Sequence, residues 1–502
     1  MRINKDTIYI LIIALLLIIG FLFFGNNLYF PLSDIGREFY IPSEISEGKV
    51  LYKDIFNLYA PLGYYINALF VKIFGNSLQV FRILGLVLSF STIYAIFEIT
   101  KLFTNRNIAL SVSIFTIVSC TFYPSISNWT TPYSYSILYA LSAVLWGLYF
   151  IIKYTNEGEN KYLYISSLLY GLSLSCKYEF ALFAFILIIS VMYKKTNIIN
   201  IFKTFFSISV FPVLSILILF HYGVSVIDLT QALYYSASLL NSDYAMYFYS
   251  YSGIILNINS IKSILFSFAH PHFVTLFYAI PIINLLILLF SLKSDFKYIL
   301  LYFSAAVLSF KVLGGINFEI YGTYFFPLLF VCLLVFLYNK KIPQKILIFL
   351  CSVLILSYTF FIFSNNTLEE VKTPKGTVKV TSEFKEALLN MTEFMSLINK
   401  EDKILLLPEG VFLNYLTDKK TDNYIFYLIP PHSEILTDNF VIKRIKNGNY
   451  KYIAISNVIY PWYNEYSYSQ GWGKDVFAFI QSKYHLKQVL GKNFKFYVYE
   501  IN

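Results

Sequence analysis

The feature that most constrains this chain is a series of apolar runs, each about as long as a helix needs to be to cross a bilayer. Hydrophobic residues make up 57% of the 502 residues and charged residues only 14%, whereas a soluble domain carries roughly a quarter of charged residues. We therefore predict a polytopic α-helical membrane protein with about eleven transmembrane helices. The expected spans are residues 8–24, 78–100, 108–122, 133–152, 162–176, 178–193, 204–222, 273–291, 297–313, 322–338 and 345–363.

The net charge of +10 does not indicate nucleic-acid binding, because Lys and Arg cluster in short loops between the apolar runs. If successive spans alternate in direction, all of these loops lie on one side of the membrane. The positive-inside rule then places the N-terminus in the cytoplasm and the chain after residue 363 outside. The clusters are Arg2 and Lys5; Lys101 and Arg106; Lys153 and Lys161; Lys194, Lys195 and Lys203; Lys293 and Lys297; and Lys340, Lys341 and Lys345.

The first loop that we expect outside, residues 25–77, combines charged and aromatic residues, most of them in the stretch from Leu32 to Phe81. Asp34, Arg37 and Glu38 follow at i, i+3 and i+4, so their side chains share one face if Asp34 begins a short helix. Further along, Pro61 can start a helix and Gly75 can end it, and the apolar spacing between them predicts a helix that lies on the bilayer or against the spans. The aromatic residues of this loop, Tyr59 among them, are read either as an interfacial belt or as part of a binding surface.

Two later polar clusters are expected at the same face. Lys177 and Glu179 separate two nearly continuous apolar runs, where they form either a snorkelling pair or a site in which Lys177 holds an anionic group such as a phosphate. Glu319 and Tyr321 lie in the loop before a later span. His270 and His272 form only a weak i, i+2 signal for a metal, and four cysteines in or near the spans show no metal-ligand spacing.

From Asn365 the composition becomes mixed and charged, so we divide the chain into a transmembrane catalytic domain, residues 1–363, and a soluble extracytoplasmic α/β domain, residues 364–502. Helices are expected at Ser382 to Asn399 and Asp475 to His485, and strands at Ile404 to Leu407, Tyr452 to Ser456 and Phe494 to Tyr499. No nucleotide-binding glycine motif follows a strand. We interpret this domain as an outer lid or an acceptor platform.

The order of these features resembles the GT-C class of membrane glycosyltransferases. It is most similar to bacterial relatives of the dolichyl-phosphate-mannose protein mannosyltransferases and of the lipid A aminoarabinose transferase. The residues that carry the resemblance are Asp34, Gly36, Arg37 and Glu38; Gly48, Leu51, Tyr52, Lys53, Asp54 and Ile55; Tyr59, Pro61, Leu62, Tyr65, Phe74 and Gly75; Lys177 and Glu179; Glu319, Tyr321, Gly322, Tyr324 and Pro327; and Pro408, Glu409, Gly410, Leu413, Asn414, Leu416 and Thr417.

The resemblance implies a donor that is a polyprenyl-phosphate sugar and transfer to a lipid, glycan or protein acceptor on the outer face of the cytoplasmic membrane. Such chemistry needs a general base for the acceptor hydroxyl and cations for the leaving phosphate. We assign Asp34 as the base and Lys177 with Arg37 as phosphate partners. The predicted substrate-binding residues are Arg37, Glu38, Asp54, Tyr59, Lys177, Glu179, Glu319 and Tyr321.

The first loop has no DxD motif, which favours a mechanism without a metal cofactor, although Glu38, Asp54 or Glu319 could complete a site for a divalent metal. Two other functions are weighed. A transporter or flippase of lipid-linked saccharides also needs many spans, but its charged sites lie near the bilayer midplane and its halves repeat, and neither is seen here. A non-catalytic assembly protein that binds glycans would be insensitive to substitution of Asp34.

Overall fold

A computed structural model describes residues 5–32, 34–240, 274–313, 318–399, 401–460 and 465–501. The predictions for His270 and His272 lie outside these residues. Helices form at all of the predicted apolar runs. The helices before the C-terminal region are α1 (Lys5–Phe24), α2 (Asp34–Ser46), α3 (Leu62–Phe74), α4 (Leu78–Phe103), α5 (Arg106–Thr116) with the π-helix η1 (Ile117–Thr121), α6 (Tyr135–Glu157), α7 (Asn160–Cys176), the 3-10 helix η2 (Tyr178–Phe183), α8 (Ala184–Tyr193), α9 (Ile198–His221), α10 (Val226–Leu240), α13 (Val274–Phe290), α14 (Phe296–Leu313), α15 (Phe318–Asn339) and α16 (Gln344–Ser364).

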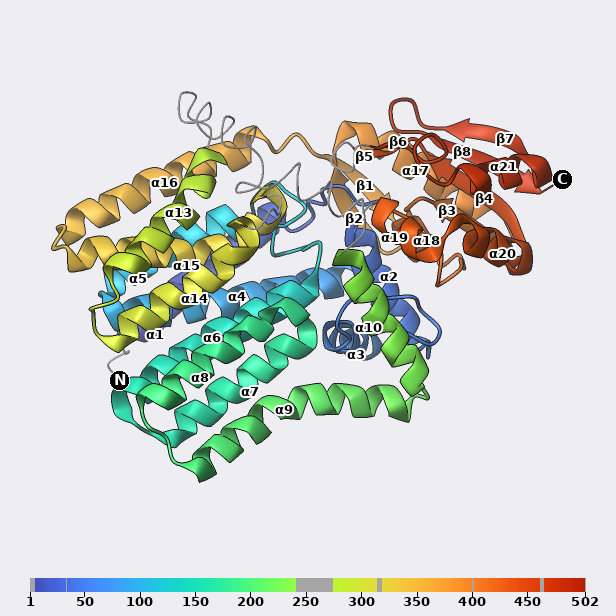
Figure 1. Cartoon of the computed structure of the whole chain (residues 1–502). Coiled ribbons are helices and arrows are strands. Elements are labelled where there is room, and N and C mark those ends of the chain that lie inside the picture. Colours follow the sequence, from blue (N-terminus) through green and yellow to red (C-terminus); the bar gives the residue numbers. More distant parts are fainter. Residues whose placement is uncertain are drawn as a thin grey trace.

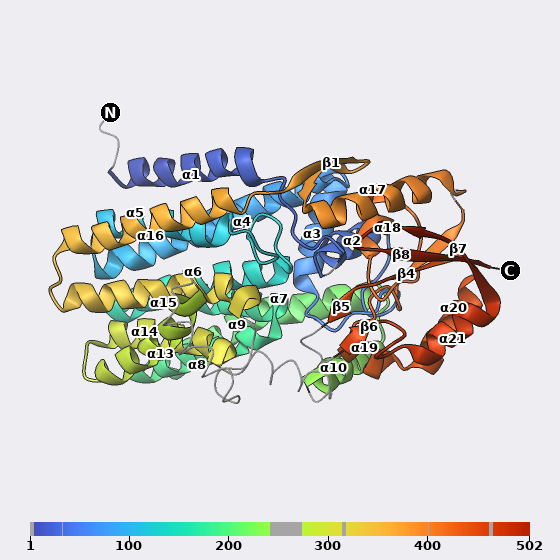
Figure 2. The same ribbon diagram turned by 90° about the horizontal axis from the view of Figure 1, so that it is seen from above.

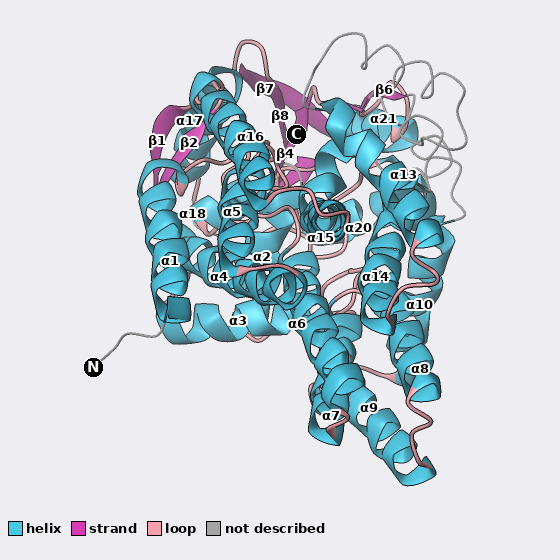
Figure 3. Cartoon of the chain, turned by 90° about the vertical axis from the view of Figure 1, so that its left-hand side faces the viewer, coloured by secondary structure: helices cyan, strands magenta, loops and turns pink. Residues whose placement is uncertain are grey.

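Within the described chain, α1, α4, α6, α9 and α16 are long and apolar enough to cross a membrane. The other apolar runs form shorter helices, among them α3 and α8. The protein is therefore a multi-span membrane protein, and most of these helices lie roughly parallel in one bundle (Figures 1 and 2). The strands lie at one end of this bundle in Figure 1, and in Figure 3, which looks along the bundle, they lie behind the helices.

The basic loops lie at the end of the bundle that also holds the N-terminus. Lys101 and Arg106 both pair with Asp6 near the start of α1. At the same end, Lys297 lies 5.8 Å from the ring centroid of Phe103. In Figure 1 the helices α2 and α3 and the C-terminal strands lie at the opposite end. The clustering of the basic loops on one side, predicted from alternating spans, is thus seen in the fold.

The chain from residue 369 to residue 501 forms what we call the C-terminal α/β region. Its strands β3 and β4 pair in parallel, and β8 pairs antiparallel with both β4 and β7, in the order β3-β4-β8-β7. The predicted helices and strands are present within a few residues. The elements are β1 (Glu369–Thr373), β2 (Gly376–Val380), α17 (Ser382–Leu397), β3 (Lys403–Leu407), α18 (Val411–Thr417), α19 (Pro430–Leu436), α20 (Asp438–Gly448), β4 (Tyr450–Ser456), β5 (Ile459–Tyr460), β6 (Glu465–Ser467), α21 (Lys474–Lys483), β7 (Tyr484–Leu490) and β8 (Phe496–Ile501).

This region is fastened to the first loop and to α4. The backbone N–H of Leu28 donates to the carbonyl of Lys379 at 2.8 Å, and the N–H of Lys379 donates to the carbonyl of Asn26 at 2.7 Å. Arg82 of α4, which is 2% exposed, donates through Nη1 to Oδ1 of Asn26 and to the carbonyl of Thr377, both at 2.8 Å. Because these bonds join a membrane helix, the first loop and β2, the C-terminal α/β region is fixed beside the first loop.

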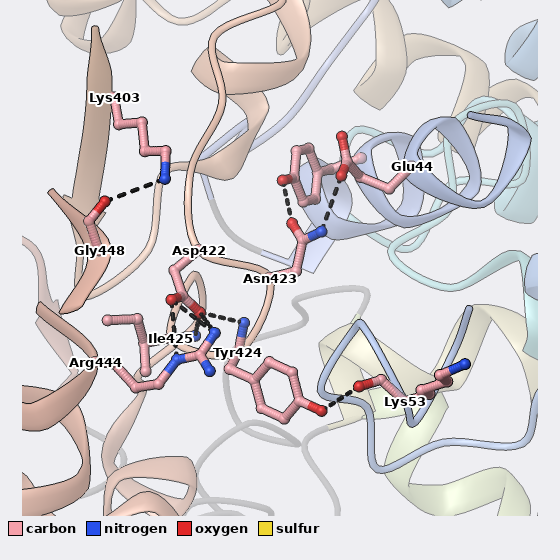
Figure 4. A network of polar contacts seen from close by, with 10 residues as sticks. Glu44, Lys53, Lys403, Asp422, Asn423, Tyr424, Ile425, Arg444 and Gly448 are labelled. Atoms are coloured by element: carbon pink, nitrogen blue, oxygen red, sulfur yellow. Dashed lines mark hydrogen bonds and ion pairs between the residues drawn. The ribbon is translucent and has the colours of Figure 1, made fainter. Parts of the chain in front are cut away.

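A second set of contacts joins the region to α2 (Figure 4). Asn423 accepts a hydrogen bond from the Tyr40 hydroxyl and donates through Nδ2 to Oε2 of Glu44 at 2.9 Å. Tyr424 donates from its hydroxyl to the carbonyl of Lys53. Helix α18 also lies directly on α2, where a Cβ added to Gly36 would come within 2.9 Å of Cβ of Phe412. Glycine at position 36 is therefore what allows the two helices to approach so closely.

Candidate active site

Three charged side chains of the first loop lie together at the start of α2, as their spacing predicts. Asp34 is the first residue of α2, and Nη1 of Arg37 lies 3.0 Å from its Oδ1. Nε of Arg37 lies 3.8 Å from Oε1 of Glu38. The side chains of Arg37 and Glu38 are 5% and 0% exposed, whereas that of Asp34 is 29% exposed. Of the two carboxylates, Asp34 is therefore the one that a substrate can reach.

Glu38 is held by groups that face it from two other helices. Its Oε2 accepts the backbone N–H of Tyr135 at 2.9 Å, and its Oε1 accepts the hydroxyl of Tyr64 at 3.0 Å. Tyr135 is the first residue of α6, so Glu38 satisfies one of the free N–H groups at that helix N-terminus. Burial raises the pKa of Glu38 to about 7, against the charge of Arg37 and these two hydrogen bonds, which lower it. Glu38 thus fixes α2 against α6 and is not free to act on a substrate.

Two cations lie over the ring of one tyrosine. Cζ of Arg37 is 4.5 Å and Nζ of Lys177 is 4.9 Å from the ring centroid of Tyr59. The carbonyl of Tyr59 is fixed by the hydroxyl of Tyr52 at 2.6 Å and by Nδ2 of Asn57 at 2.7 Å. Lys177 follows the last residue of α7 in an extended conformation, and a cation is favourable at a helix C-terminus. Arg37 of α2 and Lys177 at the end of α7 thus meet at the ring of Tyr59.

The C-terminal α/β region adds two residues that we did not predict. The hydroxyl of Tyr427 donates to Oδ1 of Asp34 at 2.7 Å, and its ring centroid lies 5.1 Å from Cζ of Arg37. His432 packs edge-on against Tyr427 with the centroids 4.9 Å apart, and burial lowers its pKa to about 3. No motif marks Tyr427 in the sequence, because almost 400 residues separate it from Asp34. We call Asp34, Arg37, Tyr59, Lys177 and Tyr427 the Asp34 cluster.

Not all of the predicted site residues join this cluster. Asp54 is used within its own loop, where its Oδ2 accepts the backbone N–H of Val50 at 2.9 Å. Glu179 is exposed in η2, directly after Lys177. Glu319 and Tyr321 lie in the first turn of α15, and their side chains are outside the described residues. Their roles in binding stay predictions.

The Asp34 cluster combines a reachable carboxylate with an excess of positive charge. Arg37 is balanced by Asp34, whereas Lys177 has no carboxylate partner within the described residues. On the side of Arg37 that faces Tyr427 and His432, the cavity holds only about 10 Å³, room for about one water molecule. Asp34, Tyr59 and Lys177 are partly exposed, so they are the members of the cluster that a ligand can reach.

The residues predicted to complete a metal site beside Asp34 are Glu38, Asp54 and Glu319, and the side chain of Glu319 lies outside the described residues. In the described part of the chain, no three His, Cys, Asp or Glu side chains gather closely enough to hold a metal ion. Both carboxylate oxygens of Glu38 accept hydrogen bonds, one from the hydroxyl of Tyr64 and one from the backbone N–H of Tyr135. What the arrangement offers chemically is a general base beside cations that can stabilise a leaving phosphate.

A comparison with protein families finds a match in the first half of the chain. Residues 59–221 match the family described as dolichyl-phosphate-mannose-protein mannosyltransferase. The match covers about a third of the chain, from Tyr59 past Lys177 to the end of α9. No curated protein sequence is significantly similar to the chain.

Solved structures of an oligosaccharyltransferase from Archaeoglobus fulgidus have a similar fold. Its complex with Zn and sulfate is 12% identical, with a TM-score of 0.54 over 89% of this chain and 67% of that chain. The same enzyme tethered through a disulfide bond to an acceptor peptide with the NVT sequon is 11% identical, with a TM-score of 0.52 over 95% and 72% of the two chains. Identities this low show the fold alone.

A third solved structure, ArnT from Cupriavidus metallidurans bound to undecaprenyl phosphate, is 10% identical and covers 98% of this chain and 97% of that chain, but its TM-score of 0.45 is too low to carry an argument. The family match and the fold shared with the oligosaccharyltransferase confirm the predicted resemblance. Residues 59–221 thus match a family of membrane glycosyltransferases, and the fold of the chain is similar to that of the oligosaccharyltransferase.

Proposed function

We propose that this protein transfers a sugar from a polyprenyl-phosphate donor to an acceptor hydroxyl at the membrane surface, with Asp34 as the general base and Lys177 with Arg37 holding the phosphate. The observation that carries the proposal is that both cations lie over the ring of Tyr59, beside the partly exposed carboxylate of Asp34. The description of the matched family, which names a dolichyl-phosphate mannose, supports a lipid-phosphate donor.

The proposed reaction uses each member of the cluster once. Asp34 takes the proton of the acceptor hydroxyl, whose oxygen forms a bond to the anomeric carbon of the donor sugar. The bond between that carbon and the phosphate oxygen breaks, and its electron pair leaves with the polyprenyl phosphate. Lys177 and Arg37 stabilise the charge that develops on the phosphate. Tyr427 keeps Asp34 oriented through the hydrogen bond to Oδ1.

We further propose the orientation and the domain division that the sequence predicts. About eleven helices span the bilayer, the N-terminus is cytoplasmic, and residues 364–502 form an extracytoplasmic domain on the domain formed by residues 1–363. Support comes from the basic loops, which lie at the end of the bundle opposite α2 and the C-terminal α/β region (Figure 1). By the positive-inside rule that basic end faces the cytoplasm, so the Asp34 cluster faces outward.

The test is mass spectrometry of surface glycans and lipids from cells that lack the gene and are complemented with wild type, Asp34→Asn or Asp475→Asn. Asp475 is an exposed residue of α21 and serves as the matched control. Loss of one sugar in the deletion should be reversed by wild type and Asp475→Asn but not by Asp34→Asn, because removing a general base lowers the rate by roughly 10²–10⁴-fold. Full restoration by Asp34→Asn would reject Asp34 as the base and favour a transporter of lipid-linked saccharides.

A further inference from the structure

A second cavity lies beside the Asp34 cluster, at the junction of the first loop and the C-terminal α/β region. It encloses about 350 Å³, within the roughly 300–1,000 Å³ typical of small-molecule sites. We call it the Ser456 cavity. Its lining residues are Phe30, Leu32, Glu383, Phe384, Glu409, Ser456, Asn457, Val458, Ile459, Asn493 and Phe494. Leu32 precedes Asp34 by two residues, and Glu409 interacts electrostatically with Asp34, so the lining of the cavity comes near the proposed base.

The polar groups of the Ser456 cavity include one without a partner in the described part of the chain. Ser456 is 3% exposed, and its Oγ has no hydrogen-bond partner among the described residues. An unsatisfied buried hydroxyl is costly, so a ligand that can bond it gains affinity. Glu409 is 5% exposed and accepts the hydroxyl of Tyr460 through Oε1. Two buried residues that carry a hydroxyl and a carboxyl thus belong to the lining of a space of ligand size.

The apolar groups of the cavity are aromatic. The ring centroids of Phe30 and Phe384 are 5.5 Å apart, and those of Phe384 and Phe494 are 5.0 Å apart. Together with the polar groups, these rings match the two kinds of surface on a sugar ring, whose C–H faces pack on aromatic rings and whose hydroxyls bond to carboxyl, amide and hydroxyl groups. The cavity is therefore suited to a polyhydroxylated ring.

The charge of the cavity distinguishes it from the Asp34 cluster. Its lining contains two acidic residues, Glu383 and Glu409, and no Lys, Arg or His. The exposed carboxylate of Glu383 repels a phosphate there, whereas Lys177 and Arg37 attract it. Glu409 lies close enough to Asp34 for the two carboxyl groups to act on each other electrostatically, and burial raises the pKa of Glu409 to about 8, so Glu409 is mostly neutral at pH 7. The donor phosphate and an uncharged ligand thus have separate places, at the two cations and in the Ser456 cavity.

We propose that the Ser456 cavity binds a saccharide unit of the acceptor and presents one of its hydroxyls to Asp34. This inference rests on the proposed function and names its acceptor class, a glycan. In the transfer, the acceptor O–H gives its proton to Asp34 and its oxygen bonds to the donor's anomeric carbon, while the polyprenyl phosphate leaves. Ser456 and Glu409 hold the remaining hydroxyls of the acceptor.

The test is saturation-transfer NMR on the full chain in lipid nanodiscs. The probes are the methyl glycosides of glucose, galactose, mannose, rhamnose and N-acetylglucosamine, and a hexapeptide rich in Ser and Thr. We expect at least one glycoside to bind saturably, and Ser456→Phe, which fills the cavity, to weaken it at least tenfold. Ser482→Phe places the same ring on the exposed face of α21 and should leave binding unchanged.

A second variant guards against misfolding of Ser456→Phe. Glu383 is an exposed lining residue, so Glu383→Lys should fold normally and weaken glycoside binding at least threefold, whereas Glu393→Lys, on the same helix α17 and outside the lining, should not. The inference is overturned if no glycoside binds saturably, if the Glu383 and Ser456 variants bind as wild type does, or if the hexapeptide alone binds in the cavity.

Binding of undecaprenyl phosphate, measured on the same samples, separates this inference from the proposed function. If the wild-type chain binds undecaprenyl phosphate but no glycoside, the proposed donor site is supported and the proposed saccharide site is rejected. If it binds no undecaprenyl phosphate, the proposed function itself falls.

Discussion

Replacing Lys177 with Met should weaken binding of a polyprenyl phosphate by about 30-fold. Two unit charges 4 Å apart interact by about 4 kcal/mol at an effective dielectric constant of 20. Lys177 is only half buried and shares the phosphate with Arg37, so the lower value of about 2 kcal/mol for a hydrogen bond to a charged group applies, and each 1.4 kcal/mol corresponds to about tenfold in Kd. Methionine retains the unbranched apolar stem over Tyr59, which limits the change to the charge.

The assay is displacement of a fluorescent polyprenyl phosphate by undecaprenyl phosphate in nanodiscs of uncharged lipid. Lys161→Met is the matched control, because Lys161 lies near the other end of α7, is 59% exposed and pairs with Glu159. Lys177→Arg should restore the wild-type Kd to within about threefold, since a guanidinium also binds phosphate. A Kd for Lys177→Met within about twofold of wild type would refute the phosphate role of Lys177, and an equal loss in Lys161→Met would trace the effect to net charge.

Three further predictions follow from the same contacts. Tyr427→Phe removes the hydroxyl that donates to Asp34, so steady-state kinetics should show kcat lower by about tenfold with KM nearly unchanged, and an unchanged kcat would exclude Tyr427 as a positioning residue. Burial raises the pKa of Glu409 from 4.5 to about 8 in the folded protein. The protonated carboxyl therefore stabilises the fold at low pH, and this contribution is lost as the pH rises through 8. The apparent Tm of wild type should fall between pH 5 and 9, and that of Glu409→Gln should fall by less. Arg82→Ala removes the two 2.8 Å hydrogen bonds to Asn26 and Thr377, which should lower the free energy of unfolding by about 2–4 kcal/mol. The apparent Tm should fall, and proteolysis after α16 should be faster. Unchanged proteolysis would show that Arg82 does not anchor the C-terminal α/β region.

The parts of the site that depend on local spacing could be predicted from the sequence. The i, i+3 relation of Asp34 and Arg37 requires only that a helix begins there, and the ion pair follows. Likewise, Pro61 and Gly75 bound α3, with Gly75 as the C-cap at φ +93° and Pro61 one residue before the helix instead of inside it. Local signals of this kind act over a few residues, so the structure that they predict does not depend on contacts with distant parts of the chain.

The parts that depend on tertiary contacts could not be predicted. Tyr427 reaches Asp34 only because the C-terminal α/β region is held on α2 by Asn423 and by the close approach of Phe412 to Gly36. Glu38 was predicted to bind substrate, yet its two oxygens bond to Tyr64 and to the first N–H of α6, and neither partner is signalled by a motif near it. Helix packing in three dimensions decides such pairings.

The origin of Tyr427 has a consequence for how the enzyme can work. The proposed base is held by a cation from the first loop and by a hydroxyl from the C-terminal α/β region, and the Ser456 cavity is lined by residues of both. A bundle without the C-terminal α/β region would keep Lys177 and Arg37 and so could still bind a polyprenyl phosphate. It would lack the group that orients Asp34 and most of the proposed acceptor site. If the proposed roles of Asp34 and the Ser456 cavity hold, the C-terminal α/β region serves as the acceptor platform, the second of the two roles predicted for it, and not only as a lid.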